Sequence, residues 1–208
     1  MTSSSTPQPL DEVLVLDAAA QELLFTTART ANTFTDEPVS DEQLQAITEL
    51  AKWPPTMANT NPLRILFVRT AEGKDRLSPH MSEGNRAKTM TAPAVAVLAV
   101  DTDFHDKIPE LLPFRPELRE NFVADAPNRE RLATFNGALQ AGYFILAVRA
   151  VGLAAGPMLG FDGPGIDREF FSDRPWKTIL VVNIGKPGTD PWFDRLPRLA
   201  HEDYVQYA

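Results

Sequence analysis

Two basic segments near opposite ends of the chain have the side chains that bind phosphate. One contains Arg29 followed by Thr30, and the other, residues 195–198, contains Arg195 and Arg198. A guanidinium group matches the geometry of a phosphate and donates several hydrogen bonds to it. Each segment also has a simpler interpretation: Arg29 complements the C-terminus of a preceding helix, and residues 195–198 carry surface charge. Only the combination with other segments points to a ligand.

Two polar segments have groups suited to the edge of a heterocycle. Residues 84–88 contain Asn85, whose amide can pair with a ring edge, and Lys88, whose charge can lie beside a carbonyl. Residues 55–62 form a polar turn, bounded by prolines, that precedes an apolar stretch. The alternatives are a solvated loop for the first segment and a capped connection for the second.

A glycine-containing segment, residues 156–162, follows the longest apolar stretch of the chain. Its glycines would let backbone N–H groups approach a planar ring closely, although a loop that terminates a helix has the same composition. Together with the two basic and two polar segments, it suggests a flavin site.

Other common site motifs are absent from the sequence. It contains neither the glycine fingerprint of dinucleotide-binding folds, nor a P-loop, nor the G-x-S-x-G turn of serine hydrolases. Asp101, Asp103, His105 and Asp106 could hold a metal ion, but a polar loop after a strand is the favoured interpretation. We expect no metal site.

The composition is typical of an acidic globular protein. The chain has 208 residues, a net charge of −8 and no cysteine. This charge disfavours nucleic-acid and anionic membrane partners, and the lack of cysteine excludes disulfides and thiolate chemistry. The longest uncharged run, residues 132–148, is too short to span a bilayer. We expect a cytoplasmic protein, with residues 1–12 as a disordered tail and residues 13–208 as one domain.

Hydrophobic spacing and capping signals place the elements that must position these segments. Ser40 and Gln43 predict a capping box that starts a helix over residues 40–52. The other expected helices are residues 18–29, 70–79, 129–151 and 166–171, and the expected strands are residues 63–69, 94–101 and 178–185. Residues 104–128, with four prolines, are expected to be irregular, and residues 156–165 to form a loop.

The helix expected over residues 129–151 is apolar on its whole surface and requires cover on most sides. Small residues near its middle would let a neighbouring helix approach closely, and a subunit interface is one way to provide the cover. The tail over residues 186–208 is rich in aromatic and aliphatic side chains, so we expect it to dock on another surface.

Several short segments between about Leu23 and Val205 resemble segments that occur in the same order in a known protein family. They are Leu24-Phe25 with Ala28-Arg29-Thr30, Ala51-Lys52-Trp53, Lys88-Thr89-Met90-Thr91-Ala92-Pro93, Gly156-Pro157-Met158 with Gly160-Phe161-Asp162, Val182-Asn183-Ile184-Gly185, and Arg195-Leu196-Pro197-Arg198-Leu199. On these residues the chain resembles the nitroreductase-like superfamily of FMN-dependent oxidoreductases. Within it, the chain resembles the branch of malonic semialdehyde reductases, also called 3-hydroxypropanoate dehydrogenases.

The resemblance implies an α+β fold with a central, mainly antiparallel sheet flanked by helices. It also implies an intertwined homodimer with FMN at the subunit interface, in which the C-terminal tail docks on the partner subunit. Arg29 and Arg195 would bind the FMN phosphate, with Thr30 nearby, and Asn85 and Lys88 would face the pyrimidine edge of the ring.

Two loops complete the cofactor site that the resemblance implies. The loop that would pass beside flavin N5 consists of Pro157, Met158, Leu159 and Gly160. The loop that would contact the FMN of the neighbouring subunit contains Pro55, Thr56, Met57 and Asn59. The chain departs from many relatives at Asn32 and Thr33, where a further cation is common, at Phe193, and at Leu159, where a Glu is common.

The implied activity is hydride transfer from NADH or NADPH through flavin N5, with malonic semialdehyde reduced to 3-hydroxypropanoate. No catalytic side chain is implied beyond electrostatic support from Lys88. The alternatives are a broad nitro, quinone or enone reductase and a non-catalytic flavin-binding dimer. A substrate carboxylate would need a cation, for which the candidates are Arg64, Arg86, Arg115 and Arg119.

Overall fold

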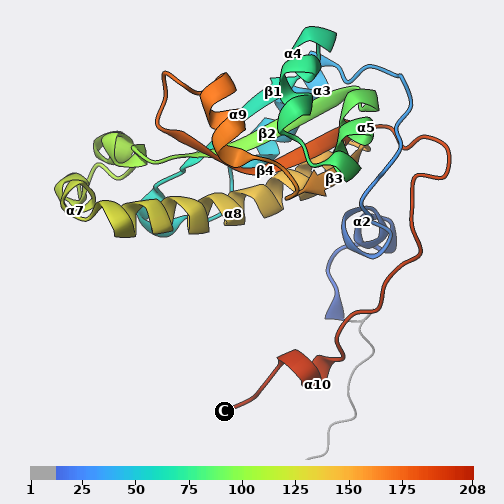
Figure 1. The fold of residues 1–208 in the computed structure, drawn as a ribbon. Helices are drawn as coiled ribbons and strands as arrows, with labels where there is room; N and C mark the ends of the chain where they lie inside the picture. The colour runs from blue at the N-terminus through green and yellow to red at the C-terminus, as the bar shows by residue number, and fades with distance from the viewer. Residues whose placement is uncertain (1–12) are drawn as a thin grey trace, which may run out of the picture.

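One antiparallel sheet forms the centre of the structure, a computed structural model that describes residues 13–208. The expected disordered tail, residues 1–12, lies outside the described residues. The strands are β1 (Leu63–Val68), β2 (Ala94–Asp101), β3 (Ala154–Met158) and β4 (Trp176–Gly185), in the spatial order β1-β2-β4-β3 (Figure 1). Each neighbouring pair is antiparallel, which confirms the predicted mainly antiparallel sheet.

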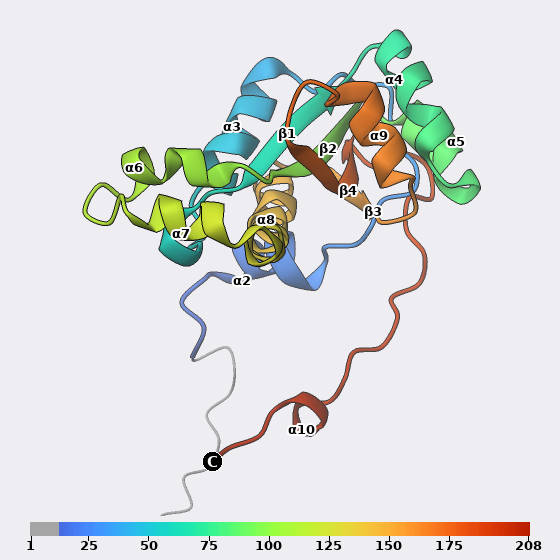
Figure 2. The ribbon, with the colours of Figure 1, turned by 60° about the vertical axis from the view of Figure 1, so that its left-hand side comes forward.

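Helices cover both faces of this sheet (Figures 1 and 2). They are α2 (Ala18–Gln21), continued by a π-helical turn over Glu22–Thr26, α3 (Asp41–Ala51), α4 (Ala71–Leu77), α5 (Glu83–Thr91), α6 (Ile108–Leu111), α7 (Leu118–Ala124), α8 (Ala126–Ala150), α9 (Gly163–Phe170) and α10 (His201–Tyr204). One core cluster joins α3 and α8 to one face of the sheet. A second cluster joins α4 and α9 to the opposite face.

Local signals in the sequence account for several of these elements. Ser40 and Gln43 form the predicted capping box: Gln43 N–H donates to Ser40 Oγ (3.2 Å) and Ser40 N–H donates to Gln43 Oε1 (3.0 Å). Strand β2 has the predicted bounds and is buried along almost all of its length. Its apolar run serves both core clusters, because alternate side chains point to opposite faces of the sheet.

The expectation that residues 104–128 are irregular is wrong, because most of the segment is helical and two of its four prolines lie at helix starts. Pro109 and Pro127 lie in the first turns of α6 and α8, where a backbone N–H has no helical partner to lose. Asp125 caps α8 by accepting from the Asn128 N–H (3.2 Å). The helices α6 and α7 pack on the start of α8 around a third, smaller core cluster.

Two further expectations are corrected at the segments that carry glycine. Residues 156–158 of the expected loop belong to β3, whose position at the edge of the sheet tolerates Pro157. Residues 84–88, for which a solvated loop was the alternative, belong to α5. The first helix ends at Thr26, before Arg29.

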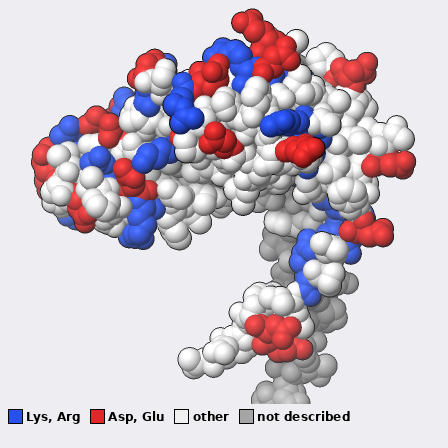
Figure 3. Space-filling model, in the orientation of Figure 1, with Lys and Arg blue, Asp and Glu red and all other residues white. Residues whose placement is uncertain are grey.

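One side of α8 and the C-terminal tail expose apolar side chains. Phe135, Leu139 and Tyr143 project from α8 with 59%, 42% and 44% exposure, and the surface over the middle of α8 is uncharged (Figure 3). The C-terminal part of the tail, which includes α10, runs away from the sheet (Figures 1 and 2), and the tail carries exposed aromatic residues. Within residues 13–208, the predicted cover for α8 and the tail is therefore not provided. Across the same residues, no helix combines the length and apolar character needed to cross a membrane.

Gly137 lies at a close approach between α8 and the sheet, which generates a stability prediction. A Cβ atom at this position would lie 2.2 Å from Val100 Cγ1 on β2. Gly→Ala in a helix usually stabilises by about 1 kcal/mol, but overpacking a core costs about 1–3 kcal/mol. We expect Gly137→Ala to lower the free energy of unfolding by about 1–2 kcal/mol in urea titrations. Gly84→Ala in α5, with no atom within 4 Å of the added Cβ, should be neutral or stabilising; equal effects would contradict the steric explanation.

His105 generates a prediction about pH. Its ring is 6% exposed, Nδ1 has no hydrogen-bond partner in the described chain, and Nε2 lies 3.8 Å from Asp106 Oδ1. Burial, followed by the charge of Arg129, lowers the pKa of His105. As the pH falls, the unfolded chain binds the proton first, so stability is lost below about pH 6.5.

We expect the wild type to lose up to about 1.4 kcal/mol more stability per pH unit than His105→Phe between pH 6.5 and 5.5. Urea titrations at pH 7.5, 6.5 and 5.5 measure the difference. Parallel pH profiles for the two proteins would show that His105 is not the group responsible.

Candidate functional site

The N-terminal basic segment lies between β3 and the C-terminal tail. Ala31 N–H donates to Ala155 O (3.1 Å), and Asn32 N–H donates to Pro191 O (3.0 Å). Residues 28–32 therefore run beside the edge strand on one side and beside the tail on the other. This arrangement brings together parts of the chain that lie far apart in the sequence.

The two predicted phosphate ligands, Arg29 and Arg195, meet at this crossing. Arg29 Nη1 donates to Phe193 O (3.2 Å), and Arg195 Nη2 donates to Ala28 O (3.3 Å). Each guanidinium group thus binds the backbone of the segment that carries the other. The alternative that Arg29 complements the first helix is not supported, because its hydrogen bond goes to the tail.

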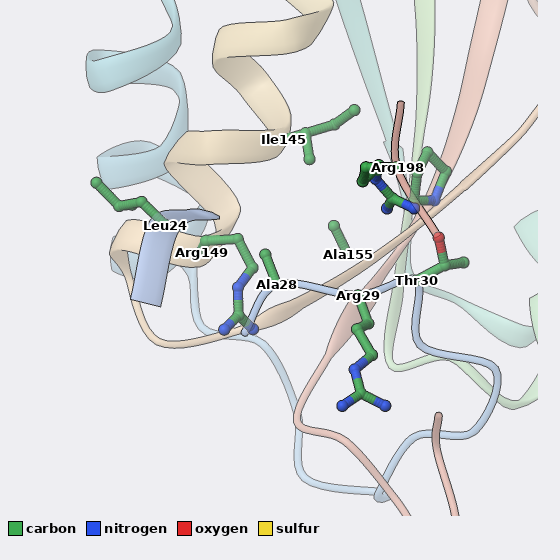
Figure 4. Close-up of a pocket in the computed structure, with 9 residues that line it drawn as sticks. Leu24, Ala28, Arg29, Thr30, Ile145, Arg149, Ala155 and Arg198 are labelled. Atoms are coloured by element: carbon green, nitrogen blue, oxygen red, sulfur yellow. The ribbon is translucent and has the colours of Figure 1, made fainter. Parts of the chain in front are cut away.

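A surface hollow opens beside Thr30 and is lined by three arginines, Arg29, Arg149 and Arg198 (Figure 4). Arg149 comes from the last turn of α8, where its Nε and Nη1 atoms donate to backbone carbonyl groups. A second hollow shares Arg29, Thr30 and Arg198 and adds Arg195. The hollows join residues from three distant parts of the sequence.

None of these four arginines forms an ion pair within residues 13–208. Their hydrogen bonds go to carbonyl oxygens only, and although Asp194 lines the second hollow, it lies beyond ion-pair distance. Burial lowers the pKa of Arg149, although guanidinium groups stay protonated in proteins. Gathered cations without counter-charges favour an anion, and phosphate matches their geometry.

A third hollow continues from this cluster to α5. It shares Asn32 and Phe193 with the second hollow and adds Lys88. Lys88 Nζ lies 3.5 Å from Asn32 Oδ1 and has no carboxylate partner in the described chain. The row of hollows therefore extends from the arginines to the helix that carries the two predicted ring-edge residues.

The predicted N5 loop is fixed to the start of α5. Asn85 Nδ2 donates to Gly160 O (2.9 Å), and Ser82 N–H donates to the same oxygen (3.0 Å). A Cβ atom at Gly160 would lie 2.7 Å from Asn85 Nδ2, so the close contact requires glycine. Pro157 lines the arginine hollow, and Leu159 is 75% exposed. Met158 is buried in the second core cluster.

The predicted loop over residues 55–59 is not brought to the arginines. Asn59 Nδ2 donates to Leu111 O (2.8 Å) at the end of α6, and Thr56 Oγ1 accepts from Asn61 N–H (3.2 Å). This loop precedes Leu63, which pairs with the end of β2, whereas the arginines lie near the start of β2. Six residues of strand separate the two ends by about 20 Å. One chain therefore carries the two halves of the predicted site at opposite ends of its sheet.

The four arginines considered for a substrate carboxylate already have partners. Arg64 pairs with Asp101 (2.8 Å), and Arg119 pairs with Asp106 and Glu120 (2.7 Å each). Arg115 pairs with Glu117, and Arg86 donates to two backbone oxygens. Among the described residues, three of the four thus have a carboxylate partner, whereas Arg86 bonds backbone oxygens only.

The acidic cluster at residues 101–106, which the sequence suggested as a possible metal site, forms ion pairs, and Arg149 was not predicted as a site residue. Of these residues, Asp101 pairs with Arg64 and Asp106 pairs with Arg119. Arg149 was missed. The available signal is that it ends the long uncharged run and is the first charge after residue 131.

The geometry agrees with what comparison of the chain with known proteins shows. The model of the "Nitroreductase family" matches residues 26–186. A Streptomyces coelicolor protein named "Putative NADH dehydrogenase/NAD(P)H nitroreductase" is 61% identical over 193 residues, covering 93% of this chain and 96% of its own. The chain therefore belongs to the nitroreductase family, which confirms the superfamily resemblance.

Solved structures show the same fold. A "putative nitroreductase in complex with FMN" from Exiguobacterium sibiricum superposes with a TM-score of 0.78 at 22% identity, covering 93% of this chain and 98% of its own. A gut-bacterial enone reductase of fatty acid saturation has a TM-score of 0.78 at 18% identity, covering 93% and 99%. At these identities the likeness establishes the nitroreductase fold alone.

Proposed function

We propose that the chain is an FMN-dependent NAD(P)H oxidoreductase that acts as a homodimer. The observation that carries this proposal is the row of hollows lined by Arg149, Arg198, Arg29, Arg195 and Lys88, cations without carboxylate partners in residues 13–208. The row suits a ligand with phosphate at one end and a polar ring at the other. The nitroreductase name of the Streptomyces coelicolor relative and the FMN in the Exiguobacterium homologue support the same choice.

Unused polar groups beside Lys88 fit the edge of an isoalloxazine ring. The backbone N–H groups of Leu159 and Gly160 donate to no protein group in the described chain. Asn85 uses its Nδ2 for Gly160, which leaves its Oδ1 free to accept a hydrogen bond. Two donors, one acceptor and one cation therefore lie along the loop and the helix, as a ring with both carbonyl and N–H groups requires.

The residues of the chain have separable roles in this proposal. FMN, when bound, supplies hydride transfer between a nicotinamide and an acceptor. Arg29 and Arg195 bind the phosphate, and Arg149 and Arg198 add positive charge that the first loop lacks. Lys88 holds a positive charge where reduction of the ring leaves a negative one, which stabilises the reduced form.

The homodimer accounts for the surfaces that one chain leaves uncovered. Pro55, Met57 and Asn59 are exposed at the end of the sheet opposite the arginines. A second subunit would supply this loop to the other half of the site. The apolar side of α8 and the aromatic tail would be covered in the same assembly, with the tail docked on the partner.

Two classes of acceptor remain in competition. The ion pairs of Arg64, Arg115 and Arg119 favour a broad reductase of nitro, quinone or enone compounds, since each of these arginines would have to leave a carboxylate partner to bind a substrate carboxylate. The branch-like sequence matches favour malonic semialdehyde as the second candidate. We propose the broad acceptor range first.

Absorbance spectroscopy tests the proposal directly. The purified protein is expected to bind FMN, and NADH or NADPH is expected to bleach the flavin under anaerobic conditions. A protein that is colourless once excess FMN has been removed contradicts the proposal. Bound flavin that stays oxidised with both nucleotides supports the non-catalytic flavin-binding alternative. The two acceptor classes are compared with one preparation. A higher kcat/KM for nitroaromatics or quinones than for malonic semialdehyde supports the broad reductase, and a higher kcat/KM for malonic semialdehyde supports a malonic semialdehyde reductase.

Removing single arginines tests the phosphate site. A hydrogen bond to a charged group contributes about 1.5–3 kcal/mol, so Arg195→Ala and Arg198→Ala should each weaken FMN binding about 10–100-fold in fluorescence titrations. Riboflavin lacks the phosphate, so its affinity should be unaffected. Arg168→Ala, an exposed arginine on α9, serves as the control. Unchanged FMN affinity in both variants would remove the cluster from phosphate binding.

A further inference from the structure

Two polar side chains are buried on the otherwise apolar α8. Asn136 and Gln140 lie one helical turn apart and are 1% and 4% exposed. Asn136 Oδ1 accepts from Met57 N–H (2.8 Å), and Gln140 Oε1 accepts from Leu63 N–H (2.9 Å). The two amides therefore hold both ends of the segment Met57–Leu63, which we call the strained loop.

Three residues of the strained loop have left-handed backbone conformations without being glycine. Their φ angles are 50° at Ala58, 51° at Asn59 and 42° at Asn61. Such conformations persist only where surrounding contacts determine them, and they concentrate at functional sites. The contacts here come from α8 and α6, together with bonds between Asn61 and Asn59 inside the loop (2.8 Å).

Neither amide of α8 is explained by packing alone. A buried polar side chain is tolerated only when its hydrogen bonds are made, and apolar residues at these positions would extend the adjoining core. Both amides also use their nitrogen atoms: Asn136 Nδ2 donates to Leu132 O (2.8 Å), and Gln140 Nε2 lies 3.4 Å from Asn61 Oδ1. Both amide oxygens and the nitrogen of Gln140 are therefore committed to the strained loop, while the nitrogen of Asn136 bonds its own helix.

We propose that Asn136 and Gln140 are positioning residues that fix the strained loop in the shape that one subunit presents to the flavin of the other. Met57 and Asn59 face outward from the loop, while the two amides hold it from beneath. This inference rests on the proposed function, because it takes the FMN site to be shared between subunits. It assigns to α8 of one subunit a part in cofactor binding at the partner's site, in addition to the charge that Arg149 at its end brings to its own subunit's hollow.

Hydrogen exchange and FMN titration test the proposal together. Asn136→Leu and Gln140→Met remove the acceptor oxygens while keeping similar volume. In FMN-free protein we expect amide exchange over residues 56–63 to be at least roughly tenfold faster in both variants, because each loses a restraining hydrogen bond. In the presence of FMN we expect its dissociation constant to rise roughly tenfold. Phe144→Leu, a buried apolar change one turn along α8, is the control for lost stability, and exchange over residues 56–63 and FMN affinity should match the wild type.

A mixed dimer tests the action across the interface. A Gln140→Met subunit is paired with an Arg195→Ala subunit by purification on two different tags. If the strained loop serves the partner, one site in this dimer has an intact loop and an intact arginine cluster, and one FMN per two chains should bind with wild-type affinity. If no such site appears, the loop does not act on the partner.

The outcomes separate the two proposals. Wild-type protein that binds no FMN ends the proposed function, and the exchange rates still decide whether the amides restrain the loop. Wild-type protein that binds FMN, with variants that exchange and bind as the control does, overturns the positioning role alone. Variants in which residues 56–63 exchange faster but FMN binds as in the wild type also overturn the positioning role.

Discussion

Positive charge without a counter-ion is the constraint on which the candidate site depends. The chain has a net charge of −8, yet Arg29, Arg149, Arg195 and Arg198 gather with no carboxylate partner within residues 13–208. Mutual repulsion opposes this arrangement, so backbone bonds must hold the segments in place. The bonds of Ala31 to β3 and of the arginines to opposite backbones do so. An anionic ligand would supply the missing charge and strengthen the fold that gathers the cations.

The length of the sheet explains why one chain cannot form the whole proposed site. The arginines and Lys88 lie near the start of β2, while the strained loop lies near its end, about 20 Å away. A rigid strand cannot bring its two ends together, so in the proposed homodimer a second copy joins the halves. The same chain leaves an apolar side of α8 and an aromatic tail exposed. The uncovered surface and the divided site thus have one common explanation.

The sequence predicted the features that depend on neighbouring residues and missed those that depend on distant ones. The capping box at Ser40 and the bounds of β2 follow from local hydrogen bonding and a continuous apolar run. Pro109 and Pro127 were misread, because a proline at a helix start and one in a loop look alike until the cap is recognised. The place of Arg149 beside Arg29 depends on how α8 ends against β3, which no local pattern encodes.

The long helix α8 explains why hydrophobic periodicity says little about the site. Gly137 lies against the sheet, Asn136 and Gln140 hold the strained loop, and Phe135 and Tyr143 face outward. Two sides therefore have different neighbours, and these neighbours favour small or amide side chains, while the outward side is apolar and exposed. A helix under such constraints loses the polar stripe that normally marks the solvent side.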